Sequence, residues 1–179
     1  MKNMEEKTNS SKVVFKGSLL DVRKDKVTLP NGKIATREWI KHPGAVCCVP
    51  ILPNKKIGLI RQYRYALKSH MIEMPAGKLN RGENPGNCVK RELEEEIGYI
   101  ANKISFLTII HPAIGFANEV MRLYLAENLI KTKPSLDGDE FLELIPTKLD
   151  DAIEMVWKGE ITDAKTIIGL LWANKVIKN

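Results

Sequence analysis

Four glutamates lie within five consecutive positions of the stretch KRELEEEIGY: Glu92, Glu94, Glu95 and Glu96. On a helix, carboxylates three or four positions apart are neighbours and repel each other by roughly 0.2–0.5 kcal/mol per pair. A bound divalent cation would convert this repulsion into binding energy, and hard cations such as Mg²⁺ prefer carboxylate oxygens together with substrate phosphates. The preceding loop AGKLNRGE could add backbone carbonyl ligands. We interpret the cluster as a metal site, with a solvated acidic face as the alternative.

The residues around these glutamates predict the helix that carries them. Asn84 is a good N-cap, Pro85 suits the first helical position, and Gly98 suits the left-handed position after the last turn. The sequence therefore predicts a helix over 85–97.

One face of this predicted helix is apolar, formed by Val89, Leu93 and Ile97. With about 3.6 residues per turn, three glutamates lie beside that stripe. They are Glu92, Glu95 and Glu96, whereas Glu94 points to solvent. Arg91 lies one turn before Glu95 and can hold it in an ion pair.

Nine residues match the Nudix box, G-x5-E-x7-R-E-U-x-E-E-x-G-U, at every specified position: Gly77, Glu83, Arg91, Glu92, Leu93, Glu95, Glu96, Gly98 and Tyr99. The chain thus resembles a Nudix hydrolase. Four further segments resemble the ADP-ribose pyrophosphatase branch: RQYRY, EMPAGKL, HPAIGFANE and DAKTIIGLLW. The resemblance implies an α/β fold, an α/β/α sandwich around a mixed β-sheet. It also implies a homodimer formed through the N-terminal strands.

The resemblance implies metal-dependent hydrolysis of a nucleoside diphosphate linked to another moiety. Glu92 and Glu96 match the metal ligands, Glu95 helps to bind the metal or orient the site, and the Ala76 carbonyl matches a backbone ligand. The implied metal is Mg²⁺, with Mn²⁺ as the alternative. Glu83 matches a residue that orients the box.

The resemblance also implies substrate contacts. Arg64, Glu73 and Glu119 match positions that touch the nucleotide in relatives, and Arg37 could reach the substrate of a partner subunit. Many relatives have a shorter loop where this chain has HPAIGFANE, which weakens the assignment of Glu119. Arg61 and Arg64 are candidates for phosphate binding because the guanidinium fork suits phosphate, with an ordinary charge at a strand end as the alternative.

Attack of water at phosphorus needs a proton acceptor, and carboxylates held by a metal are poor bases. In this branch the base often comes from an acidic loop between late strands, here SLDGDEFLEL. We predict Glu140 as the base, with Asp139 as the fallback and a solvated acidic loop as the alternative.

The rest of the chain predicts one small domain preceded by an arm. Residues 1–11 are polar and predict a disordered tail, and the β-leaning runs up to PNG predict antiparallel hairpins. We assign 1–43 to the tail and arm and 44–179 to the hydrolase domain. The hydrolase domain contains five stretches with strand character: AVCCVPIL, KIGLIRQYR, ISFLTII, EVMRLYLAENL and FLELIPT. Helical spacing follows in 148–157 and 161–177.

The distribution of charge, the apolar runs and the cysteines indicate which partners and sites to expect. Residues 1–43 hold 10 Lys and Arg against 5 Asp and Glu, so the arm carries +5 of the net +6. Such an arm could bind nucleic acid, an anionic small molecule or an acidic protein surface. Because no aromatic residues interleave with its charges, we expect that it does not bind nucleic acid. No apolar run is long enough to span a membrane, and we expect a cytoplasmic protein. Cys47, Cys48 and Cys88 have no metal-ligand spacing and predict core positions.

The leading functional hypothesis is hydrolysis of ADP-ribose to AMP and ribose 5-phosphate. The close alternative is another nucleotide sugar, GDP-mannose or UDP-glucose. A non-catalytic sensor that binds ADP-ribose is a third hypothesis, but such modules usually carry a degraded box and a DNA-binding domain. Here the box is intact, and the chain after residue 144 is too short for a winged helix beside the fold's own helices.

Overall fold

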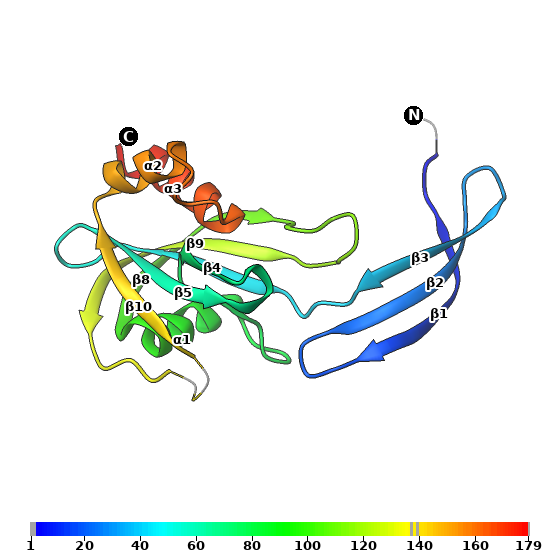
Figure 1. Ribbon diagram of the computed structural model, residues 1–179, viewed down its shortest axis with the longest axis horizontal. Helices are drawn as coiled ribbons and strands as arrows, with labels where there is room; N and C mark the ends of the chain where they lie inside the picture. Colours follow the sequence, from blue (N-terminus) through cyan, green and yellow to red (C-terminus); the bar gives the residue numbers. More distant parts are fainter. Residues whose placement is uncertain (1–2, 137, 139, 179) are drawn as a thin grey trace.

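The computed structural model describes residues 3–136, 138 and 140–178. The N-terminal arm is a three-stranded antiparallel sheet in the order β1-β2-β3, with strands β1 (Lys7–Lys16), β2 (Asp21–Thr28) and β3 (Ile34–Ile40). In Figure 1 the arm lies beside the rest of the molecule and is joined to it where β3 leads into β4.

The prediction of a disordered tail over residues 1–11 is wrong from Lys7 onward, because β1 begins there and pairs Lys7 with Thr28. Every residue of β1 is exposed. The strand is therefore held by its backbone hydrogen bonds to β2, which a polar composition does not reveal. The predicted antiparallel pairing of the arm is confirmed.

The part of the described chain that follows the arm contains two sheets. The first sheet consists of β4 (Ala45–Pro50), β7 (Ala76–Lys78), β8 (Tyr99–Ile110) and β9 (Met121–Lys131), in the order β7-β4-β9-β8. It is mixed, because β4 runs parallel to β9 while the other pairs are antiparallel. The second is antiparallel in the order β10-β5-β6, with β5 (Ile57–Arg64), β6 (Ser69–Glu73) and β10 (Leu142–Thr147). A 3₁₀ turn, Tyr65–Leu67, connects β5 to β6. The turn PNKK joins β4 and β5, which belong to different sheets.

Helices cover both faces of these sheets. Helix α1 (Pro85–Ile97) lies on one side, and α2 (Leu149–Trp157) and α3 (Ala164–Lys178) lie on the other, below and above the strands in Figure 1. All six residues of β4 are buried, which explains its unbroken apolar sequence. Cys47 packs in the cluster with α3 and Cys48 in the cluster with α1, so the prediction that these cysteines are core residues is confirmed. The α/β/α sandwich expected from the sequence is the fold observed.

Helix α1 has the predicted bounds. The Asn84 side chain accepts a hydrogen bond from the Gly86 amide at 2.9 Å, and Gly98 ends the helix with φ of +67°. A Cβ on Gly98 would lie 2.8 Å from Pro134, so both the backbone conformation and the available space require glycine. The predicted apolar stripe is buried, and Glu94 is exposed.

No helix in the described part of the chain is long and apolar enough to cross a membrane.

Candidate active site

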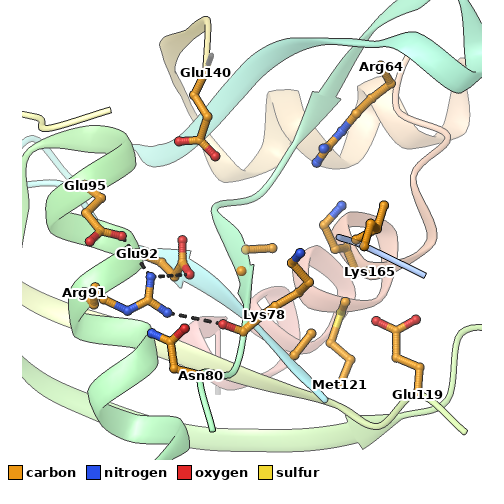
Figure 2. A pocket seen from close by; sticks show the side chains of 14 residues that line it. Arg64, Lys78, Asn80, Arg91, Glu92, Glu95, Glu119, Met121, Glu140 and Lys165 are labelled. Atoms are coloured by element: carbon orange, nitrogen blue, oxygen red, sulfur yellow. Dashed lines mark hydrogen bonds and ion pairs between the residues drawn. The ribbon is translucent and has the colours of Figure 1, made fainter. Parts of the chain in front are cut away.

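A cavity of about 610 Å³ lies where the glutamate-rich helix meets the two sheets. The residues that line it come from several parts of the chain. They belong to the β1–β2 turn of the arm, to β4, β5, β7 and α1, to the start of β9, to the segment before β10 and to the start of α3. Figure 2 shows acidic side chains from α1 on one side and the cations Arg64 and Lys165 on the other. The cavity therefore has an acidic wall and a basic wall.

Arg91 organises the acidic wall. Its guanidinium nitrogen Nη1 lies 2.8 Å from Glu92 Oε1 and 2.9 Å from Glu95 Oε2, and its Nε donates to Glu83 Oε1 at 3.0 Å. The Lys78 carbonyl also accepts from Nη2 at 3.2 Å. The predicted Arg91–Glu95 ion pair is confirmed. Arg91 also ties α1 to the loop before it.

Glu83 sits at the centre of that loop. Besides Arg91, its carboxylate accepts a hydrogen bond from the Asn80 backbone at 2.8 Å. The hydrogen bonds from Arg91 and then from Asn80 lower the pKa of Glu83 to about 2. Glu83 therefore holds the shape of the loop as a permanent carboxylate.

Glu96 is the most buried acid of the helix, with 7% of its surface exposed. Its Oε2 accepts a hydrogen bond from the Ala76 backbone at 3.2 Å. Burial, followed by repulsion from Glu92 and Glu140, raises the pKa of Glu96 to about 8. Burial also raises the pKa of Glu92 above its ordinary value, although Arg91 acts in the opposite direction. Buried carboxylates that repel one another form an electrostatic environment that favours a cation.

Gly77 gives the backbone of β7 close access to these acids. A Cβ on Gly77 would lie 1.7 Å from Glu92 Oε1, so any side chain would displace the carboxylate. Ala76, whose carbonyl is the predicted backbone ligand, is the neighbouring residue and its amide already contacts Glu96. Carboxylates beside an open backbone segment are a donor set that suits an oxygen-preferring divalent cation.

The three acids do not converge fully in this conformation. Among the residues described, no group of three His, Cys, Asp or Glu side chains is arranged to hold one metal ion. Two of the acids, Glu92 and Glu95, are instead turned toward Arg91.

Arg64, Glu73 and Lys165 form the basic wall. Glu73 is 3% exposed and accepts two hydrogen bonds from Arg64, at 2.6 and 2.7 Å, and one from Lys165 at 2.6 Å. Burial alone would raise the pKa of Glu73, but the hydrogen bonds and charges of the two cations outweigh burial, and the pKa is lowered. The two cations share the Glu73 carboxylate, and Lys165 has Asp163 as a second acidic partner at 3.0 Å. Arg64 and Lys165 line the cavity, whereas Glu73 lies behind them.

Lys165 is held in place by the start of α3. The Asp163 carboxylate accepts hydrogen bonds from the Thr166 amide at 3.1 Å and the Thr166 hydroxyl at 2.6 Å, and lies 3.0 Å from the Lys165 ammonium. The Thr166 hydroxyl in turn accepts from the Met74 amide at 2.8 Å. This chain of bonds fixes the first turn of α3 against the end of β6.

The other predicted residues are distributed as follows. Glu140 lines the cavity on the side of the loop before β10, and Figure 2 shows its carboxylate directed inward. Glu119 also lines the cavity, 3.8 Å from the His42 ring nitrogen Nε2. Asp139, the fallback base, lies outside the described residues.

Two predicted substrate contacts lie away from this cavity. Arg61 pairs with Glu143 across β5 and β10 at 2.6 Å, and both side chains are more than half exposed. Arg37 pairs with Glu6 within the arm. Within this chain the structure does not bring either arginine to the acidic wall.

Lys165, Lys78 and Asn80 line the cavity and were not singled out from the sequence. Lys165 lies in the segment DAKTIIGLLW, where nothing in its spacing relates it to Arg64 or Glu73. Lys78 and Asn80 belong to the loop AGKLNRGE, whose position next to the glutamates was the available indication.

Two domain families match the chain. The NUDIX domain matches residues 41–168, and the nucleoside diphosphate sugar hydrolase N-terminal domain matches residues 6–40.

Individual relatives cover nearly the whole chain. An ADP-ribose pyrophosphatase of Bacillus subtilis is 43% identical over 93% of this chain and 91% of its own length. A methanol dehydrogenase activator of Bacillus methanolicus is 40% identical over 94% of this chain and 92% of its own length. An ADP-ribose pyrophosphatase of Mycobacterium tuberculosis is 34% identical, with coverages of 94% and 83%.

The fold is also similar to that of a solved structure described as an ADP compounds hydrolase. The TM-score is 0.88, and the match covers 99% of this chain and 97% of the other. The sequence identity of 23% makes this a likeness of fold alone.

Proposed function

This chain belongs to the Nudix hydrolase family, and from that membership we propose that it hydrolyses ADP-ribose to AMP and ribose 5-phosphate. The observation that carries the proposal is the opposition of the two walls of the cavity. Glu92 and Glu95 line one side and Arg64 and Lys165 the other. Glu96 is buried on the same helix as Glu92 and Glu95. A diphosphate bridging the walls would meet a cation site at one face and fixed positive charge at the other. ADP-ribose pyrophosphatases among the most similar relatives support this choice of substrate.

The metal belongs to the proposal. Glu92 and Glu96 would hold it, with Glu95 and the Ala76 carbonyl assisting, and we propose Mg²⁺ with Mn²⁺ able to replace it. When bound, such an ion neutralises charge on the diphosphate oxygens and lowers the pKa of bound water. Arg91 keeps Glu92 and Glu95 oriented, and Glu83 keeps Arg91 in place.

The chain's own residues orient the substrate and accept the proton. Arg64 and Lys165 would bind the phosphate or sugar oxygens, and Glu119 would contact the nucleotide. Glu140 is the proposed general base, because its carboxylate is directed toward Glu92 and Glu95 and its charge acts on Glu92 and Glu96. It would take the proton of the attacking water.

We propose that Glu73 supports the substrate site from behind, a change from the substrate contact expected from the sequence. Three hydrogen bonds already occupy its carboxylate. Its role is to hold Arg64 and Lys165 together despite their mutual repulsion.

The arm is the proposed dimerisation element. Val13, Val14 and Phe15 of β1 are about half exposed, at 47%, 56% and 56%. These three side chains form exposed apolar surface on β1 that a second copy would cover. Arg37 would reach the partner's substrate, and the domain division at 43/44 is retained as part of this proposal. The cysteines of the chain are all unpaired and buried, which suits the reducing cytoplasm.

Other nucleotide sugars remain the second candidate, because GDP-mannose pyrophosphatases of Shigella flexneri and Escherichia coli are 30% identical over 70% of this chain. The methanol dehydrogenase activator is nearly as similar as the first ADP-ribose pyrophosphatase, so overall identity does not discriminate between their activities.

A substrate panel tests the proposal. ADP-ribose, GDP-mannose and UDP-glucose would be supplied with Mg²⁺, and released phosphomonoesters measured after phosphatase treatment. We expect ADP-ribose to have the highest kcat/KM, with AMP and ribose 5-phosphate as products identified by chromatography. A higher kcat/KM for GDP-mannose would establish the second candidate instead. Binding of ADP-ribose without turnover would support the sensor.

A further inference from the structure

A second cavity of about 620 Å³ adjoins the first. Three segments form it: the β1–β2 turn of the arm, the link between β3 and β4, and the loop after β7. Leu19, Lys78 and Asn80 line both cavities, so the second cavity opens directly beside the proposed active site.

Positive charge dominates its lining. The four cations are Lys16, Lys41, Lys78 and Arg81. Lys16 comes from the arm, Lys41 from the link, Lys78 from the end of β7 and Arg81 from the loop after it. All four are exposed at the cavity, and none forms an ion pair with any residue that the structure describes.

The single carboxylate that lines this cavity, Asp21, does not neutralise these cations fully. Arg23 holds it with two hydrogen bonds, Nε to Oδ1 at 2.5 Å and Nη2 to Oδ2 at 2.8 Å. This hydrogen bonding, together with the nearby charges of Lys16 and Lys41, lowers the pKa of Asp21. With Asp21 matched by Arg23, the four cations remain as excess positive charge in a concave surface.

Cations gathered from three separate segments repel one another, and a concave surface concentrates their field on whatever occupies it. Arginine and lysine donate charge-assisted hydrogen bonds to phosphate oxygens. From this geometry we propose that the second cavity is a subsite for a phosphate monoester. The subsite rests on the proposed function for one point only, that the adjoining cavity binds a nucleoside diphosphate derivative.

Because Leu19, Lys78 and Asn80 line both cavities, the subsite would affect which substrates bind. A substrate whose diphosphate lies at Glu92 and Glu96 could extend past Lys78 into the second cavity. The subsite would then favour nucleoside diphosphate derivatives that carry a further phosphate on a sugar, such as the 2′-phosphate of ADP-ribose. A free phosphate ion has the same chemistry and is the other possible source of the group.

The test uses the variant K41Q/R81Q, which removes two of the charges without touching a residue of the first cavity. The matched control is K33Q/K175Q, which removes the same charge from exposed lysines outside both cavities. Titration calorimetry with inorganic phosphate, at low ionic strength, compares the three proteins, and phosphate bound by Arg64 and Lys165 in the first cavity contributes equally to each. We expect K41Q/R81Q to bind phosphate at least about tenfold more weakly than the wild type and the control, as two lost charge-assisted hydrogen bonds would give. Equal affinity in all three proteins would overturn the subsite.

Kinetics with ADP-ribose and its 2′-phosphate identify the source of the group. If the phosphate is carried by the substrate, K41Q/R81Q lowers kcat/KM for the 2′-phosphate at least about tenfold while ADP-ribose is turned over as before. If only the calorimetric effect appears, the subsite holds free phosphate. An equal loss with both substrates and no calorimetric change would contradict the proposal. A wild-type protein that turns over neither compound refutes the proposed function, and the phosphate titration still decides the subsite.

Discussion

The carboxylate of Glu73 and the ammonium of Lys165 lie 2.6 Å apart, although 92 residues separate them in the chain. Glu73 ends β6 and Lys165 stands in the first turn of α3, so this ion pair joins the second sheet to the C-terminal helix. Because Arg64 binds the same carboxylate, one buried acid fixes two cations at the edge of the cavity. The basic wall is thus a product of tertiary packing.

Removing the Lys165 charge should weaken substrate binding. We expect K165M to raise KM for ADP-ribose roughly tenfold to a hundredfold with little change in kcat, because a charge-assisted hydrogen bond to the ground-state substrate would be lost. K165R restores a cation and should recover part of the affinity. Steady-state kinetics measure both. A variant whose kcat alone falls would show that Lys165 acts in the chemical step.

Replacing Glu73 should affect both stability and binding. E73Q leaves Arg64 and Lys165 repelling each other without their shared counterion. We expect a loss of about 2 kcal/mol in the free energy of unfolding, a modest value because Arg64 is 44% exposed. Urea denaturation measures the loss, and KM for ADP-ribose should rise with it. The exposed pair Arg61–Glu143 supplies the control, since E143Q should change stability by less than about 1 kcal/mol. A stable E73Q protein with unchanged KM would contradict the support role.

Glu96 should be needed for the metal. We expect E96Q to lower kcat by about 10²-fold or more, because the metal ion whose charge stabilises the reacting diphosphate would bind more weakly. Independently of activity, Mg²⁺ should raise the melting temperature of the wild type by mass action and raise that of E96Q much less. E94Q is the matched control, because Glu94 is exposed on the same helix. An unaltered Mg²⁺ response in E96Q would exclude Glu96 as a ligand.

Glu140 should act as the base. We expect E140Q to lower kcat by roughly 10²–10⁴ with little change in KM, which is the usual contribution of a positioned base. D139N provides the comparison. If E140Q loses less than about tenfold while D139N loses far more, Asp139 is the base.

Glu83 should make the protein sensitive to acid. Its pKa in the folded state, about 2, is below the ordinary value of 4.5, so its stabilising contribution is complete above about pH 4.5 and is lost as the pH falls toward 2. E83Q lacks this contribution at every pH. The stability difference between wild type and E83Q should therefore be largest at neutral pH and shrink between pH 4.5 and 2, as measured by denaturant unfolding. A difference that does not vary with pH would mean that the Glu83 charge is unimportant.

The sequence by itself determined the parts of this protein that depend on neighbours along the chain. Asn84, Pro85 and Gly98 gave both ends of α1, because capping is a local matter of backbone hydrogen bonds and dihedral angles. The 3.6-residue period put Glu92, Glu95 and Glu96 beside the buried stripe, and the box motif led to the family.

Tertiary structure decided what depends on pairing between distant segments. Residues 7–11 form a strand because β2 supplies their hydrogen-bond partners, although their composition favours a tail. Arg91 binds Glu83 as well as the expected Glu95, and Lys165 reaches Glu73 only because α3 packs against the end of β6. An ion pair or a strand ladder needs two groups within a few ångströms, and separation along the chain says nothing of that distance until the core has formed.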